Sequence, residues 1–120
     1  MANPNIVNVA NIYGKTTGAA LTTTTTTELL ANASSSNKIY KINSVIITNV
    51  DGTSAATATI DHYDGSTGYK IANVLSVPGG ASVVLIDKNS SFYLEEGQSI
   101  RGGASAAGDL EIVISYEDIS

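Results

Sequence analysis

The sequence contains no cysteine and no tryptophan among its 120 residues. The lack of cysteine excludes a disulfide framework, a thiolate metal site and a cysteine nucleophile. Charged residues make up only 14% of the chain, which is well below the usual proportion in globular proteins. Disordered chains combine high charge with few β-branched residues, whereas this chain is rich in Ile, Val and Thr. We therefore expect a folded protein, and its length suits a single domain.

Basic residues are also few, and the formal net charge is -5. A nucleic-acid-binding surface needs clustered Lys and Arg to contact phosphates. The six basic residues are scattered along the chain: Lys15, Lys38, Lys41, Lys70, Lys88 and Arg101. The acidic residues gather toward the C-terminus, where they favour solubility or could meet a basic partner surface. We expect no nucleic-acid partner.

Long apolar runs are missing as well. No run approaches the length of a membrane span, so we expect no membrane association. The N-terminus lacks a basic region followed by an apolar one, so we expect no signal peptide and a product that is made in the cytosol and not secreted.

What the sequence does contain is a series of short β-prone segments, each bounded by turn residues, at intervals of about ten residues. The expected strands are 6–13, the threonine tract 22–27, 38–50, 55–63, 69–77, 81–86, 92–94, 99–102 and 110–116. This spacing predicts an all-β fold, a single antiparallel β-sandwich of eight or nine short strands, with a jelly-roll or immunoglobulin-like order. Residues 1–5 are expected to form an N-terminal arm, and residues 6–120 the sandwich domain.

Four local features sharpen this prediction. Consecutive threonines disfavour a helix and favour a surface strand, although a flat hydroxyl array that contacts glycans or ice is an alternative. The segment 28–33 is the one stretch with helical character. The segment 38–50 carries apolar residues on both faces and is expected to be a central strand, with Ile42 and Ile46 on one face and Val45 and Ile47 on the other. The segments 92–94 and 99–102 are expected to pair as a hairpin.

Catalytic and metal-binding patterns are weak. His62 is the sole histidine, strand alternation sends Asp61 to the opposite face, and no glycine-flanked serine accompanies it. Asp61 with Asp64, or Glu95 with Glu96, could offer oxygen ligands to calcium, but the twelve-residue loop of a calcium site is missing. The glycine pairs match no phosphate-binding fingerprint. The sequence therefore predicts no enzyme, no catalytic, cofactor-binding or metal-ligating residues, and no cofactor.

Five segments carry a resemblance to a known family. They are NPNIVNV (3–9), KINSVIITNVDG (41–52), VPGGA (77–81), YLEEG (93–97) and SYEDIS (115–120). In their order along the chain they resemble small virion structural proteins of tailed bacteriophages, especially of marine cyanophages, over nearly the whole length. The resemblance implies a non-enzymatic component of the virion and gives no catalytic residue to carry over.

Three roles within a particle stay open. The favoured one is capsid decoration, in which a homo-oligomer binds the major capsid protein or other virion proteins and reinforces the head. The low charge suits close repeated packing, and the N-terminal arm could embrace a neighbour. The second role is a neck, tail or fibre-associated module. The third is a host-glycan-binding module, with Tyr40, Tyr63 and Tyr69 as its aromatic platform. The residues that would contact a partner are not predicted.

Overall fold

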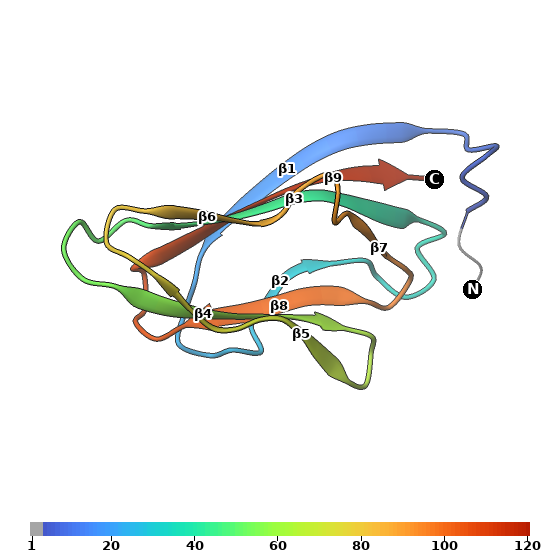
Figure 1. Ribbon diagram of the computed structural model, residues 1–120. Helices are drawn as coiled ribbons and strands as arrows, with labels where there is room; N and C mark the ends of the chain where they lie inside the picture. Colours follow the sequence, from blue (N-terminus) through green and yellow to red (C-terminus); the bar gives the residue numbers. More distant parts are fainter. Residues whose placement is uncertain (1–3) are drawn as a thin grey trace.

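The computed structural model describes residues 4–120 and forms two antiparallel β-sheets that pack face to face (Figure 1). The described residues contain nine strands: β1 (Ile12–Ala20), β2 (Glu28–Ala31), β3 (Ile39–Asn49), β4 (Ala56–Tyr63), β5 (Gly68–Val77), β6 (Ser82–Ile86), β7 (Phe92–Leu94), β8 (Ser99–Ala104) and β9 (Leu110–Ile119). The predicted all-β sandwich is confirmed.

Strands that lie far apart in the sequence lie side by side in both sheets. Sheet A has the order β1-β9-β3-β6, with β7 also pairing with β3, and sheet B has the order β2-β8-β4-β5. Only the β4–β5 and β6–β7 connections join strands of the same sheet, and every other connection crosses between the layers. The pairing of β1 with β9 brings Ile12 opposite Ile119 and so joins the two ends of the described chain.

The core lies between the sheets, and the two sheets fill it with side chains of different size. Sheet A contributes mainly bulky buried residues: Ile42, Val45, Ile47, Ile86, Leu94, Leu110, Ile112 and Ile114. Sheet B contributes Ala56, Ala58, Ile60, Ala72, Val77, Ile100 and Ala104, about half of which are alanine. Gly102 of β8 belongs to the same face, and a Cβ there would overlap the Cδ1 of Ile60. Small residues on sheet B thus leave room for the branched side chains of sheet A.

A β-bulge in β3 corrects the predicted faces of this strand. The register between β3 and β9 shifts between Ile42 and Ser44. The extra residue turns the strand, so Val45 and Ile47 are buried on the same side as Ile42, while Ile46 is only half-buried. Strict alternation had placed them on opposite faces. The prediction that this segment is a central strand is confirmed, because β3 pairs with β9 on one side and with β6 and β7 on the other.

Three of the local predictions near the N-terminus are wrong. Residues 6–11 form turns and bends, and the first strand starts only at Ile12. The threonine tract forms a turn closed by its own hydroxyls, since the Oγ1 atoms of Thr22 and Thr27 lie 2.9 Å apart and the Thr27 hydroxyl donates to the Thr24 carbonyl. This folded loop leaves no flat hydroxyl array. The segment expected to be helical is strand β2, which pairs with β8.

The predicted closing hairpin is also wrong. β7 pairs with β3 in sheet A, whereas β8 pairs with β2 and β4 in sheet B. The turn at Gly97, with a φ of 79°, therefore carries the chain from one layer to the other. Both segments are strands as expected, but their partners come from elsewhere in the chain.

Two buried asparagine side chains join the layers near the two ends of β3. The Asn49 amide nitrogen donates to the carbonyls of Ser54 and Val77, each at 2.9 Å, and its oxygen accepts the N–H of Asp51. The Asn32 amide nitrogen donates to the carbonyls of Lys38 and Leu94 at 2.8 and 3.0 Å. Val77 and Leu94 end their strands, whereas Ser54 and Lys38 lie just outside a strand. The two amides therefore supply hydrogen-bond donors to carbonyls at the margins of both sheets.

We expect Asn49→Ala to lower the free energy of unfolding by about 2–4 kcal/mol, because the buried carbonyl of Val77, the part-buried carbonyl of Ser54 and the N–H of Asp51 lose their partner. Urea denaturation followed by circular dichroism measures this. Asn73→Ala is the matched control, since Asn73 is exposed on β5 and its loss should change stability little. Equal stability of the two variants would contradict the role of Asn49.

Candidate functional site

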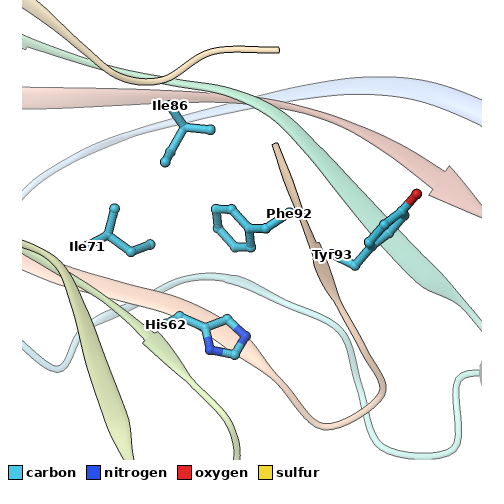
Figure 2. A pocket seen from close by; sticks show the side chains of 5 residues that line it. All are labelled: His62, Ile71, Ile86, Phe92 and Tyr93. Atoms are coloured by element: carbon cyan, nitrogen blue, oxygen red, sulfur yellow. The ribbon is translucent and has the colours of Figure 1, made fainter. Parts of the chain in front are cut away.

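An apolar pocket of about 330 Å³ lies between the two sheets. It is lined by His62 of β4 and Ile71 of β5 on one side, and by Ile86 of β6 with Phe92 and Tyr93 of β7 on the other. Figure 2 shows the His62 ring of β4 next to the Phe92 ring of β7. His62 is thus the one titratable group on the sheet B side of this pocket.

The His62 side chain is fixed in its orientation by a ring contact and a hydrogen bond. Its ring meets the Phe92 ring edge-on, with 5.9 Å between the centroids. Its Nε2 lies 3.1 Å from the Oε1 of Gln98, and this same oxygen accepts the N–H of Glu95. Because the shared atom is an acceptor, Nε2 carries the proton and donates it. The partner at Nε2 is therefore an amide, whereas in a Ser-His-Asp arrangement Nε2 faces the serine hydroxyl and a carboxylate binds the Nδ1–H.

Asp61 points away from this pocket, as strand alternation predicts, and binds Arg101 on the other face of sheet B. The guanidinium makes two hydrogen bonds to the Asp61 carboxylate, Nε to Oδ1 at 3.0 Å and Nη2 to Oδ2 at 2.8 Å. The Nζ of Lys70 lies 3.7 Å from the same carboxylate. The Arg101 guanidinium also stacks on the Tyr63 ring, 3.9 Å from its centroid. Gly68 makes this pair possible, because a Cβ there would overlap Asp61 and Arg101.

The candidate calcium ligands do not converge. Asp61 is held by Arg101, whereas Asp64 accepts the N–H groups of Ser66 and Thr67 in the β4–β5 turn. These backbone hydrogen bonds lower the pKa of Asp64. Glu96 accepts the N–H of Asn37. Within residues 4–120, no three His, Cys, Asp or Glu side chains come together in a group that could hold a metal ion.

We expect Gly68→Ala to lower the free energy of unfolding by about 1–3 kcal/mol, because the added methyl group must displace the buried ion pair. Thermal or urea denaturation measures the loss. Gly52→Ala is the control, since a Cβ at Gly52 meets no atom within 4 Å. If Gly68→Ala were as stable as Gly52→Ala, the ion pair would not depend on the missing side chain.

A second polar cluster lies on the inner side of sheet A, near the paired chain ends. Asp118 of β9 is buried, and its Oδ2 binds the Nζ of Lys15 at 2.9 Å and the Nζ of Lys38 at 3.3 Å. The rings of Tyr40 and Tyr116 lie beside it, 5.1 Å apart between centroids. The Oδ1 of Asp118 is buried and makes no hydrogen bond to any of the described residues. The two ion pairs connect β9 to β1 and to the residue just before β3.

Charge and burial act in opposite directions on Asp118. Burial alone would raise the pKa of its carboxyl group, but the hydrogen bonds and positive charges of Lys15 and Lys38 outweigh burial and hold the pKa below its ordinary value. Sequence reasoning noticed the acidic C-terminus but not this cluster. The signal was present, because the two-residue period places Tyr116 and Asp118 on the same face as Ile112 and Ile114, and a carboxylate on an inner face requires a cation.

We expect Lys15→Met to raise the pKa of Asp118, because the stronger hydrogen bond and one positive charge are lost. Carbon-detected NMR titration of the Asp118 carboxyl group measures this, with Lys88→Met in an exposed loop as the control. Since the folded pKa is depressed, the stabilisation is complete above the unfolded pKa of about 4 and is lost as pH falls through the folded pKa. An unchanged pKa of Asp118 in Lys15→Met would contradict this account.

The three tyrosines expected to form an aromatic platform do not share one surface. Tyr40 belongs to sheet A and packs on Tyr116. Tyr63 belongs to sheet B, and Arg101 covers one face of its ring. Tyr69 of β5 is exposed. The structure therefore does not gather them into a platform for sugar rings.

Comparison with family models, curated proteins and solved structures finds no match for the chain. The resemblance to phage virion proteins thus depends on the five quoted segments alone. In the part of the chain that the structure describes, no helix has the length and apolarity needed to cross a membrane.

Proposed function

We propose that this protein is a non-enzymatic structural component of a tailed-bacteriophage virion that decorates the head by binding the major capsid protein. The order of the five sequence segments supports the virion role. The observation that carries the binding role is the segment before β1, residues 4–11, which holds apolar side chains out in solvent.

Residues 1–3 of the expected arm (1–5) lie outside the described residues. Residues 4–11, called the arm from here on, are fixed at their base and shaped along their length. The N–H groups of Ala10 and Asn11 donate to the carbonyl of Ser120, at 2.8 and 3.1 Å. Farther out, the side-chain oxygen of Asn5 accepts the N–H of Val7 at 3.0 Å. The arm is therefore held in one turn before a partner arrives, which reduces the entropy lost on binding.

The apolar side chains of the arm have little cover from the rest of the protein. Val7 is 92% exposed and Ile6 is 50% exposed. Burying such a side chain against a partner contributes about 1.5–3 kcal/mol. A fixed arm with two neighbouring uncovered aliphatic side chains suits a shallow apolar groove on another protein. We therefore assign the capsid contact to residues Ile6 and Val7.

The interior of the sandwich supports a structural role in preference to a catalytic one. The pocket at His62 is apolar, and the imidazole is oriented by Gln98. The buried carboxylates of Asp61 and Asp118 each bind two cationic side chains. These groups stabilise strand pairs, and their partners leave them poorly placed for acid–base chemistry.

We expect the double variant Ile6→Asp/Val7→Asp to lose binding to the head while its melting temperature stays unchanged, because both side chains lie outside the core. Phage particles that lack the protein are mixed with purified wild type or variant and sedimented, and the bound fraction is measured. Val84→Asp is the matched control, since Val84 is 60% exposed on β6, away from the arm. Equal binding of the double variant and wild type would refute the assignment.

The same particles separate head decoration from the other roles. A copy number comparable to that of the major capsid protein, together with heat resistance that the added wild-type protein restores, supports decoration. A copy number that is a small fraction of the major capsid protein would instead indicate a neck, tail or fibre module. Binding of the isolated protein on a glycan array, with no binding to particles, would favour the host-glycan role.

A further inference from the structure

The edge strand β1 is open to solvent on both faces. Eight of its nine residues are exposed and one is half-buried. Among the described strands it pairs with β9 alone, and Figure 1 shows it at the rim of sheet A. A long uncovered edge of this kind is a template for pairing with another strand.

The backbone groups on the free edge of β1 can be identified from its pairing with β9. Asn11 and Ser120 exchange two backbone hydrogen bonds, at 3.1 and 3.0 Å, and Leu21 donates to Leu110 at 2.8 Å. In an antiparallel ladder the residues between such pairs point their N–H and C=O groups away from the partner. The unbroken register then turns five residues outward: Ile12, Gly14, Thr16, Gly18 and Ala20.

The other sheet edges are protected from pairing, and β1 is not. β2, β6 and β7 have only four, five and three residues. β5 is longer, but its register with β4 shifts twice and Val74 within it has a φ of 53°. Such bulges and kinks prevent a second strand from adding to an edge. β1 has nine residues, no proline and no register shift.

Nothing in the described residues 4–120 requires a glycine at either of two positions in β1, Gly14 and Gly18. Neither Gly14 nor Gly18 has a positive φ, and no bulge interrupts the strand. A Cβ at Gly14 would meet no atom within 4 Å, and one at Gly18 would make only ordinary contacts. Glycine weakens a strand interior by about 0.5–1 kcal/mol relative to alanine. Glycines at such positions often mark the close approach of another backbone.

We propose that two copies of the protein pair through β1, antiparallel and about a two-fold axis, to form one continuous sheet. The register that uses all five outward residues places Thr16 opposite Thr16 of the second copy, Gly14 opposite Gly18, and Ile12 opposite Ala20. This gives about ten backbone hydrogen bonds. A second copy is the occupant because β1 itself is the long regular edge that matches β1 in length.

The side chains on the outer face fit the same register. A shallow depression of about 320 Å³ lies over β1 and β9, lined by Gly18, Ala19, Ala20, Glu111, Ile112 and Val113. Ile12 is 54% exposed, and its position opposite Ala20 directs it into the depression of the second copy. The one charged side chain of β1, that of Lys15, binds Asp118 of its own chain and so adds no net repulsion. The interface is thus isologous, as a two-fold axis requires.

This pairing rests on the proposed decoration role, for which a homo-oligomer is expected from the sequence, but its test uses the purified protein alone. A failed test leaves the binding of Ile6 and Val7 to particles unaffected, and a failed particle assay leaves the dimer unaffected. The two proposals therefore fail separately.

Sedimentation equilibrium of the purified protein tests the proposal. The expected mass for the wild type is twice the chain mass of 12.3 kDa, and Thr16→Pro should return it to 12.3 kDa. Proline should be tolerated because the Thr16 N–H faces away from β9, and circular dichroism checks the fold. Thr16→Lys is the second variant, in case proline disturbs the strand, and it should dissociate the dimer as well.

Disulfide cross-linking locates the two-fold axis of the dimer. The cross-link is specific to the introduced cysteine, because the sequence contains no native cysteine. In Thr16→Cys the two Cα atoms should lie about 5.5 Å apart, within the range that a disulfide spans. Mild oxidation should link this variant fully. Ser76→Cys, exposed on the protected edge of β5, should stay unlinked. The proposal would be overturned if the wild type were a monomer, a trimer or a larger assembly. It would also be overturned if the dimer persisted in both Thr16→Pro and Thr16→Lys, or if the two cysteine variants cross-linked equally.

Discussion

The amides of Asn32 and Asn49 set the main constraint on this fold. Most connections in the sandwich pass from one sheet to the other, so the strands end at the margins of the core. The carbonyls of Ser54, Val77, Lys38 and Leu94 at these margins need hydrogen-bond donors. Each amide donates to two of these carbonyls, one of them at the end of a strand in the other sheet. The apolar packing of Ile, Val and Ala between the sheets depends on these closures, because an unsatisfied carbonyl would draw water into the core.

The alternation of apolar and polar residues correctly predicted which side chains face the core in strands where no distant contact changes the pattern. The alternation of residues in 55–63 predicts that Ala56, Ala58 and Ile60 face inward, and the structure buries all three. The pattern gave the wrong structure where hydrogen bonds to residues far away in the sequence determine the local conformation. The threonine tract became a turn because the carbonyls of Thr22 and Thr27 accept hydrogen bonds from Ala104 and Gly102, about eighty residues away. The segments 92–94 and 99–102 lie next to each other in sequence, yet they pair in different sheets.

The polar clusters were predictable in the same partial way. The opposite facing of His62 and Asp61 follows from strand alternation, but the partners of both come from other strands. Arg101 lies forty positions from Asp61, and Lys15 lies 103 positions from Asp118. The sequence alone can predict that an inward carboxylate needs a cationic partner, but it cannot tell which of the six basic residues is that partner. The exposure of the apolar residues in the arm and in β1 could likewise not be predicted from the sequence. It depends on which surfaces the rest of the folded chain leaves uncovered.

The meeting of Ser120 with Asn11 has a topological consequence. These residues exchange backbone hydrogen bonds, so the start of β1 and the end of β9 occupy one place in the molecule (Figure 1). A short linker joining position 120 to position 10 would therefore give a circular permutant that keeps every strand pair, with its new ends in the exposed turn at 64–67. Because the two ends meet, the order of the strands can be kept while the chain starts and stops in a different loop.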